Sequence, residues 1–261
     1  MEDQKQTVLI TGCSQGGIGH ALAHEFASKG CIVVASSRSK RTMADLENDS
    51  RFFVQELDVV SDESVENVVA NVIEKFGRID ILVNNAEVLC IGPLPSFHYQ
   101  LSRCIRRAMR MIQAVVPHMA ARKKGKIVNI GSIGAVSPAP WTSVYCASKS
   151  SLHSLTDTLR SELHPFGIHV TLVTLRAIKS NVANVAAGNY SRMPELKILS
   201  RREHILKNHQ MQTLQKYLQG RLWLFCSRTS PQLGFLSVSN LLSWKYIPVC
   251  QILLKTFLQG E

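Results

Sequence analysis

The sequence predicts a single α/β domain in which helices pack on both faces of a doubly wound parallel sheet. Short apolar runs of strand length alternate along the chain with longer segments whose apolar residues recur at helical spacing. The short runs are apolar at consecutive positions, which is typical of strands buried on both faces. Six such strands are expected, around residues 8–10, 31–35, 52–57, 79–83, 127–130 and 168–173.

Longer segments between these strands carry apolar residues on one helical face. Such stripes predict helices that include residues 18–26, 65–76, 109–119 and 152–163. Ser61 is expected to cap the second helix, because a serine hydroxyl accepts hydrogen bonds from first-turn N–H groups. Gly77 follows that helix at a position where glycine commonly ends helices.

The composition is that of a globular protein. A hydrophobic fraction of 45% with a net charge of +11 excludes a disordered or collagen-like chain. No apolar run reaches 18 residues, so a spanning helix is not expected, and the polar start predicts no signal peptide. Seven cysteines without a C-x-x-C pair predict reduced thiols in a cytosol-facing protein, with no metal site.

Positive charge is concentrated in two regions. Residues 177–261 carry 11 basic and 3 acidic side chains. The interval between Glu87 and Asp157 has no acidic residue but contains Arg103, Arg106, Arg107, Arg110, Arg122, Lys123, Lys124 and Lys126. A solvated basic helix face is one interpretation, and a phosphate-bearing cofactor or a membrane surface is another. Nucleic acid is not expected, since interleaved aromatics and helix-turn-helix or zinc spacings are absent.

The alternating pattern ends near Gly188. We therefore divide the chain into a dinucleotide-binding and catalytic core at 1–187 and a divergent extension at 188–261. Leu233–Leu258 fits a final strand and helix, or an interfacial segment with snorkelling lysines. A reading-frame change in the gene model would also produce such an extension.

A glycine-rich loop lies between the first strand and the first helix, from Thr11 to Gly19. Glycines there let the backbone approach a pyrophosphate, which the helix N-terminus attracts. A tight turn alone also needs glycine, but the strand–loop–helix context favours a dinucleotide. The expected cofactor contacts in this loop are Gly12, Ser14, Gly16, Gly17, Ile18 and Gly19.

The end of the second strand favours NADPH over NADH. An acidic residue there would hold the ribose 2′-hydroxyl of NAD, but none occurs before Asp45. Arg38 could instead pair with a 2′-phosphate, and Ser37 could donate a hydrogen bond to it. An idle surface arginine is the alternative interpretation.

Two further groups follow the third and fourth strands, where parallel sheets bind ligands. Asp58 and Val59 follow the third strand, and Asn85 and Ala86 follow the fourth. We expect all four to contact the cofactor. Asp58 is equally compatible with a helix cap, and the asparagine with a simple turn.

The most specific combination is Ser132, Tyr145 and Lys149. Tyr145 and Lys149 are four residues apart and share one face of a helix. A phenol with a pKa of about 10 is a poor acid at neutral pH, and a nearby ammonium is expected to lower that pKa. Tyr145 could then protonate a developing alkoxide, and Ser132 could donate a hydrogen bond to the same oxygen. A core tyrosine with a surface lysine is the alternative.

These residues resemble the short-chain dehydrogenase/reductase family from about Val8 to Ser180. The extra glycine in Thr11–Gly19 and the stretch Arg122–Asn129 are similar to its NADPH-dependent 1-acyldihydroxyacetone phosphate reductases, plant members included. The resemblance implies a Rossmann-like fold and reduction of a lipid-like ketone by NADPH. It implies that Tyr145 is the acid, that Ser132 orients the carbonyl and that Lys149 holds the nicotinamide ribose.

The resemblance also places Ile178 at the cofactor, and implies residence at the endoplasmic reticulum or lipid droplets, cytoplasm being the alternative. Peripheral membrane contact and a homo-oligomer are compatible with it. Three departures point to a second hypothesis, a catalytically impaired NADP-binding protein. Glu87 replaces the family's glycine after the fourth strand, Cys104 takes the position of an asparagine, and Leu175-Arg176 replaces a Pro-Gly pair.

Overall fold

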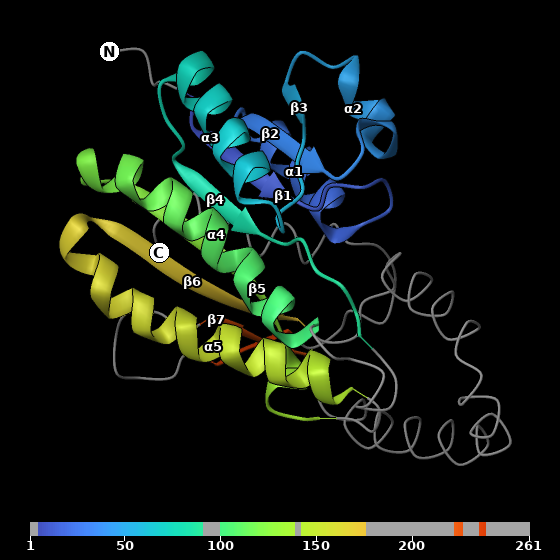
Figure 1. Ribbon diagram of the computed structural model, residues 1–261, viewed down its shortest axis with the longest axis vertical. Coiled ribbons are helices and arrows are strands. Elements are labelled where there is room, and N and C mark those ends of the chain that lie inside the picture. The colour runs from blue at the N-terminus through green and yellow to red at the C-terminus, as the bar shows by residue number, and fades with distance from the viewer. Residues whose placement is uncertain (1–4, 91–99, 139–141, 176–221, 227–234, 239–261) are drawn as a thin grey trace, which may run out of the picture.

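The computed structural model describes residues 5–90, 100–138, 142–175, 222–226 and 235–238. The strands of these residues form one sheet in the order β3-β2-β1-β4-β5-β6-β7-β8 (Figure 1). The strands are β1 (Thr7–Thr11), β2 (Ile32–Ser37), β3 (Phe52–Glu56), β4 (Ile81–Asn84), β5 (Gly125–Ser132), β6 (Ile168–Leu175), β7 (Leu222–Cys226) and β8 (Phe235–Val238). The first six pair in parallel, which confirms the doubly wound Rossmann-like prediction.

The last two strands extend the sheet with the opposite direction. β7 pairs antiparallel with β6, and β8 pairs antiparallel with β7. A final strand was one of the two interpretations of Leu233–Leu258, and β8 lies in that range, whereas β7 was not expected. The proposed boundary at residue 188 remains a prediction, because most of 188–261 lies outside the described residues.

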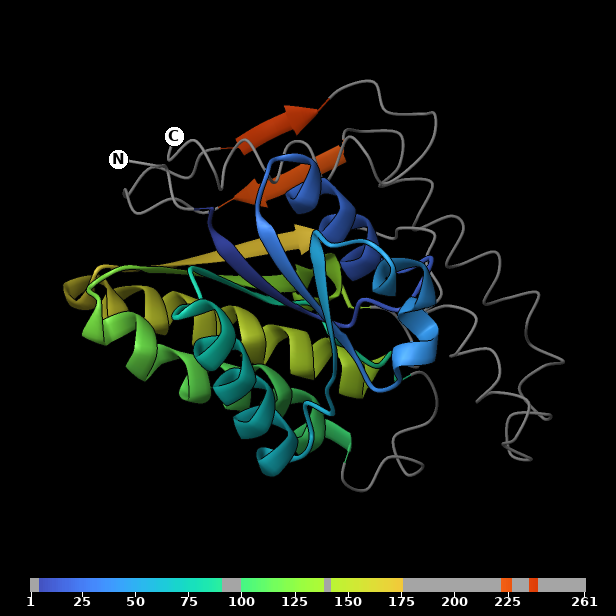
Figure 2. The same cartoon turned by 90° about the horizontal axis from the view of Figure 1, so that it is seen from above.

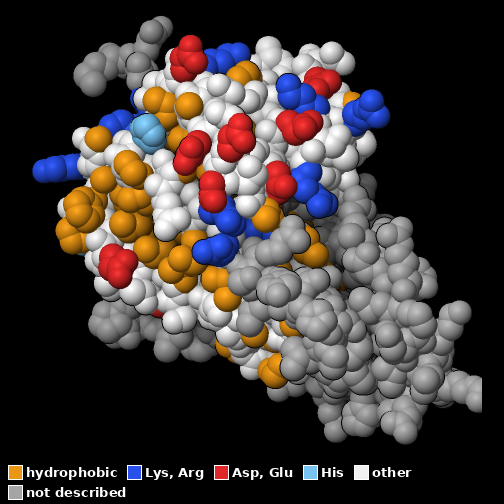
Figure 3. Space-filling model, in the orientation of Figure 1, with side chains coloured by type: hydrophobic (Ala, Val, Ile, Leu, Met, Phe, Trp, Pro, Cys, Tyr) orange, Lys and Arg blue, Asp and Glu red, His pale blue; other side chains and the backbone are white. Residues whose placement is uncertain are grey.

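Helices cover both faces of the sheet. They are α1 (Ile18–Ser28), α2 (Ala44–Glu47), α3 (Asp62–Phe76), α4 (Gln100–Ala121) and α5 (Ser143–Leu163), with short 3-10 turns η1 (Lys40–Met43), η3 (Ile133–Ala135) and η4 (His164–Phe166). Figure 2 shows α3, α4 and α5 on one face and α1 on the other. On the α3–α5 side, charged side chains intermix over α3, whereas hydrophobic ones gather over α4 and α5 (Figure 3).

Alternate residues of the parallel strands β1 to β6 enter two separate cores. Val8 and Ile10 of β1 pack with α1 residues such as Phe26, whereas Leu9 between them packs with α3 residues such as Val68. All of these side chains are at most 4% exposed. Burial on both faces explains why the strands are apolar at consecutive positions rather than at every second one.

The predicted helix signals at α3 are confirmed. The Ser61 hydroxyl accepts a hydrogen bond from the Ser64 N–H at 3.2 Å. Gly77 ends the helix with φ of +72°, a left-handed conformation that glycine adopts without strain. The β3 strand ends at Glu56, one residue earlier than expected, so Asp58 lies in the turn before the helix.

The strand order reverses between β1 and β4. The chain proceeds from β1 outward to β2 and β3, and then returns to β4 on the other side of β1. In sheets of this kind a crevice opens at the carboxyl ends of the two central strands. The glycine-rich loop follows β1 at that edge, and Asn85 to Cys90 follow β4.

A buried carboxylate ties the opposite edge of the sheet together. Asp80 accepts a hydrogen bond from the Thr7 N–H at 2.9 Å and ion-pairs with Arg78 and Arg122, each at 3.0 Å. Its side chain is 9% exposed. Removing it would leave two partly buried guanidinium groups without that charge partner.

We predict that Asp80→Ala lowers the free energy of unfolding by roughly 3 kcal/mol, as expected when one partner of a buried ion pair is removed. Urea denaturation followed by circular dichroism measures the change. Asp157→Ala is the matched control, because Asp157 pairs with Arg160 but is 62% exposed, and it should cost less than about 1 kcal/mol. Equal losses in the two variants would contradict the prediction.

Candidate active site

The glycine loop approaches the end of β4 so closely that side chains are excluded from it. Gly12 has φ of +77°, and a Cβ on it would lie 2.9 Å from the Ala86 Cα. A Cβ on Gly19 would lie 2.5 Å from the Gly12 carbonyl oxygen and from the Asn85 side-chain nitrogen. Gly12 and Gly19 are therefore required by packing at the crevice, and Gly12 also by its backbone conformation.

The start of α1 fits a phosphate group. Its N-cap, Gly17, makes no side-chain capping hydrogen bond, and the first turn contains no acidic residue. N–H groups at such a helix end have no intrahelical acceptor and carry a partial positive charge. A dinucleotide pyrophosphate would be held here by the backbone from Gly16 to Gly19, with Ser14 and Ile18 beside it.

Asn85 and Ala86 lie at the expected place, where they hold the glycine loop. The Asn85 side-chain amide donates to the Thr11 and Gly12 carbonyl oxygens at 2.8 and 3.0 Å. The Thr11 hydroxyl in turn accepts from the backbone N–H groups of Asn85 and Ala86, each at 3.0 Å. The asparagine thus positions the loop, a role that the sequence pattern alone did not reveal.

At the end of β2, the two residues expected at a 2′-phosphate, Ser37 and Arg38, differ in their exposure. Arg38 is exposed at the crevice edge, where it could reach a phosphate. Ser37 is buried, and its hydroxyl donates to the Ser39 carbonyl oxygen at 2.8 Å and lies 2.8 Å from the Thr42 hydroxyl. The Ser37 hydroxyl therefore shapes the loop that presents Arg38.

The residues after β3 also divide by role. Val59 is buried and lines the pocket, as a cofactor contact would. The Asp58 carboxylate accepts a hydrogen bond from the Val60 N–H at 3.0 Å, and the Asp58 N–H donates to the Ser64 hydroxyl at 3.0 Å. Asp58 thus stabilises the start of α3, which was the alternative interpretation.

Ser132, Tyr145 and Lys149 converge beside this crevice. Ser132 ends β5, while Tyr145 and Lys149 come from successive turns of α5. Tyr145 and Ser132 both border Gly134: a Cβ on that glycine would lie 3.3 Å from the Tyr145 Cε1 and 3.4 Å from the Ser132 Oγ. Lys149 is 6% exposed and donates to the Ile130 carbonyl oxygen at 2.8 Å, with its Nζ 5.8 Å from the Tyr145 ring centroid.

A chain of polar side chains fixes α5 against the sheet. The Asn84 amide donates to the Asn129 side-chain oxygen at 2.9 Å, and the Asn129 amide donates to the Thr156 hydroxyl at 2.9 Å. Asn129 and Thr156 are fully buried. This connection from β4 through β5 to α5 sets the position at which Tyr145 and Lys149 meet Ser132.

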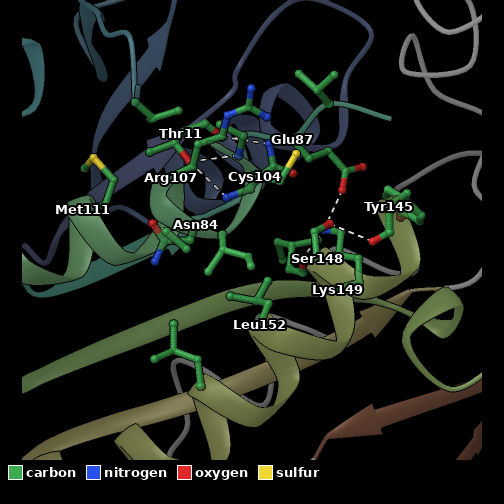
Figure 4. Close-up of a pocket in the computed structure, with 18 residues that line it drawn as sticks. Thr11, Asn84, Glu87, Cys104, Arg107, Met111, Tyr145, Ser148, Lys149 and Leu152 are labelled. Carbon is green, nitrogen blue, oxygen red and sulfur yellow. Dashed lines mark hydrogen bonds and ion pairs between the residues drawn. The ribbon is translucent and has the colours of Figure 1, made fainter. Parts of the chain in front are cut away.

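Glu87 changes the electrostatics of this group. Its carboxylate lies 2.6 Å from the Lys149 Nζ, and the ion pair is largely shielded from water. Figure 4 shows the Glu87 side chain directed at Lys149, with Tyr145 beside the pair. The ammonium that was expected to act on Tyr145 is therefore already paired with a carboxylate.

The expectation that Lys149 lowers the pKa of Tyr145 is wrong for this structure. Burial raises the pKa of the Tyr145 phenol, and the negative charge of Glu87 raises it further. The neighbouring Ser132 hydroxyl lowers the pKa but does not compensate for these two effects. Tyr145 is therefore a neutral phenol at physiological pH, able to donate a proton but strongly disfavoured as a phenolate.

The pocket between β4, α4 and α5 also contains Cys104 and Arg107, neither of which the sequence singled out as a ligand contact. A solvated basic face was one of the interpretations offered for Arg107 and its basic neighbours. That interpretation is wrong for three of the eight basic residues, since Arg107 lines the pocket, while Arg110 and Arg122 pair with Asp62 and Asp80. Arg107 follows Cys104 by about one helical turn, and this spacing is the sequence signal that could have placed both side chains on the pocket face of the helix.

Two expectations fall on residues beyond those described. Ile178, the remaining expected cofactor contact, and Arg176 both lie outside the described residues. Leu175 ends β6 opposite Ser132 of β5, and its side chain is buried in the α1-side core. Among the described helices, none has the length and apolar character needed to cross a membrane.

The family model for short chain dehydrogenase matches residues 6–189, most of the chain. The chain belongs to the short-chain dehydrogenase family. A short-chain dehydrogenase of Penicillium crustosum is 38% identical over 186 residues, covering 69% of this chain and 68% of that protein. The NADPH-dependent 1-acyldihydroxyacetone phosphate reductase of Schizosaccharomyces pombe is 35% identical over 195 residues, covering 72% of this chain and 64% of that protein.

Solved structures agree with this membership. A metagenomic short-chain oxidoreductase in complex with NADP has a TM-score of 0.62 at 27% identity, covering 70% of this chain and 89% of that chain. A gluconate 5-dehydrogenase from Burkholderia cenocepacia, in complex with NADP and tartrate, has a TM-score of 0.64 at 27% identity, covering 69% of this chain and 74% of that chain. This short-chain dehydrogenase is thus an oxidoreductase by family.

The thiols of this short-chain dehydrogenase should differ sharply in reactivity. A hydrogen bond with Cys90 lowers the pKa of Cys104 to about 6, with a further contribution from Arg107, although burial opposes both. Burial raises the pKa of Cys13 to about 12. We predict that iodoacetamide at pH 7 modifies Cys104 at least tenfold faster than Cys13, because the thiolate is the nucleophile.

Peptide mass spectrometry over a time course measures both rates in one sample. Cys90→Ser, which weakens the thiol hydrogen bond, should slow the modification of Cys104. The fully buried Cys13 is the internal control. Equal rates for Cys104 and Cys13 in the folded protein would refute the assignment.

Proposed function

We propose that this short-chain dehydrogenase reduces a ketone to a secondary alcohol with NADPH as the cofactor. The observation that carries the proposal is that Tyr145 and Ser132 border the same glycine, Gly134, next to the buried Lys149 and beside the glycine loop. When bound, the reduced nicotinamide supplies a hydride to the carbonyl carbon. The Tyr145 hydroxyl donates its proton to the oxygen, and the Ser132 hydroxyl hydrogen-bonds the same oxygen as its charge develops.

The cofactor preference rests on the end of β2. Arg38 is exposed there and no acidic residue follows before Asp45, which supports NADPH over NADH. The NADP complex of the similar metagenomic oxidoreductase agrees with this preference. Lys149 would hold the nicotinamide ribose only after its ion pair with Glu87 loosens, because the ribose and the carboxylate bind the same ammonium group.

A lipid-like ketone with an anionic group is the substrate class that we propose. Apolar side chains, including Ile105, Met111 and Leu152, line the pocket together with the cationic Arg107. Such a lining suits an acyl chain attached to a phosphate, as in 1-acyldihydroxyacetone phosphate, for which the Schizosaccharomyces pombe relative is named. Residence at the endoplasmic reticulum or lipid droplets, peripheral membrane contact and a homo-oligomer remain predictions.

We predict that Tyr145→Phe lowers kcat by at least about 100-fold while leaving the affinity for NADPH within about threefold. The hydroxyl acts on the substrate oxygen, and its loss removes general acid catalysis. NADPH oxidation at 340 nm with 1-acyldihydroxyacetone phosphate measures turnover, and nicotinamide fluorescence measures binding. NADH titrated in parallel should bind more weakly. Equal losses of turnover and binding would contradict the role of Tyr145.

A second candidate function is that of an impaired NADP-binding protein. The Glu87–Lys149 ion pair favours it, because it engages the lysine and raises the pKa of the phenol. Binding of NADPH without turnover of any ketone would support this candidate. In that case the double variant Glu87→Gly with Cys104→Asn should raise activity by at least about tenfold.

If the enzyme is active, Glu87 should control its pH dependence. Oxidation of an alcohol needs the Tyr145 phenolate and so increases as pH rises towards the pKa of Tyr145. Since Glu87 raises that pKa, Glu87→Gln should lower it and move the rising limb of alcohol oxidation to lower pH. Glu162→Gln, on the exposed face of the same helix α5, should leave the profile unchanged. Identical profiles for Glu87→Gln and the wild type would refute the coupling.

A further inference from the structure

Two histidines and a carboxylate converge away from the pocket, where α1 meets α2. His20 and His24 are four residues apart on α1, and Asp45 lies on α2. The Asp45 Oδ2 is 2.7 Å from the His20 Nε2 and 3.8 Å from the His24 Nε2. One potential ligand atom from each of the three residues lies within 4.8 Å of the others.

The two separations from Asp45 are close to those around a tetrahedral zinc ion. Ligand atoms at bond lengths of about 2.0–2.1 Å in a tetrahedron are about 3.3–3.4 Å apart, between the two distances observed. Each of the two Asp45 separations therefore needs to change by less than about 1 Å. The ligand types, two imidazoles and a carboxylate, match those of zinc sites that keep a fourth position for water.

The neighbouring residues hold the cluster in this arrangement. The His20 and His24 rings meet edge to face with centroids 4.7 Å apart, and the His24 ring packs edge-on against Phe52 at 5.4 Å. The His20 side chain is 14% exposed and the His24 side chain 48% exposed. One imidazole is thus fixed inside the cluster while the other faces water, which leaves an entry path for an ion.

We propose that His20, His24 and Asp45 form a binding site for a divalent transition metal of the zinc type. A bound ion would join α1 to α2, whose preceding turn is already attached to the glycine loop. The Thr42 hydroxyl there lies 3.1 Å from that of Ser14, and the Gln15 N–H donates to the Thr42 carbonyl oxygen at 2.8 Å. The site is separate from Tyr145 and does not depend on the proposed reductase activity.

Binding of Co²⁺ to the full chain provides the test. The protein is stripped with a chelator, its accessible thiols are alkylated, and Co²⁺ is added while the visible d–d bands are recorded. We expect one equivalent to bind and Zn²⁺ to displace it. His24→Ala and Asp45→Asn should each weaken binding at least tenfold, and circular dichroism verifies that both variants fold.

The control is the second histidine pair of the described residues, His164 and His169, whose ring centroids are 6.4 Å apart. In the described part of the chain, only the cluster of His20, His24 and Asp45 brings three such ligand atoms together. His164→Ala should therefore leave Co²⁺ affinity unchanged. Absence of binding at millimolar Co²⁺, or binding unaffected by both His24→Ala and Asp45→Asn, would overturn the proposal. A protein that does not turn over NADPH would leave the proposal of a metal site unaffected.

Discussion

The close contact between the glycine loop and the end of β4 is the constraint on which the site depends. Thr11 and Asn85 exchange hydrogen bonds across the crevice, and the backbones approach until no Cβ fits at Gly12 or Gly19. This contact joins the two strands at which the winding of the sheet reverses. It also directs the first N–H groups of α1 towards the place where a pyrophosphate would lie.

The catalytic side of the crevice depends on a single buried ammonium. Among the described residues, Lys149 has two partners, the Ile130 carbonyl oxygen and the Glu87 carboxylate. An isolated buried ammonium would be costly, and the carboxylate offsets that cost. The same carboxylate acts on Tyr145 in the opposite sense, by making its phenolate less stable. Glu87, which follows β4, therefore links the stability of the buried charge to the acidity of the proton donor Tyr145.

The sequence was most informative where local chemistry decides the structure. The six parallel strands, the cap at Ser61 and the glycine at 77 follow from propensity and pattern, and the structure has them where expected. The grouping of Ser132, Tyr145 and Lys149 was also readable, because two residues share a helix face and the third ends a strand at the same edge of the sheet. β7 was not predicted: Leu222–Cys226 is an apolar run, but its antiparallel pairing with β6 is a long-range contact that the run does not specify.

What the sequence determined by itself is the order of the six parallel strands and of the helices α1, α3, α4 and α5, and the residue types at the carboxyl edge of the sheet. Only the tertiary structure decided how those residues are used. It assigned Asn85 to the loop, turned the Ser37 hydroxyl inward, used Asp58 at the start of α3 and paired Glu87 with Lys149. The physical reason is that hydrogen-bond partners and pKa shifts depend on distance and burial in space, which spacing along a chain does not specify.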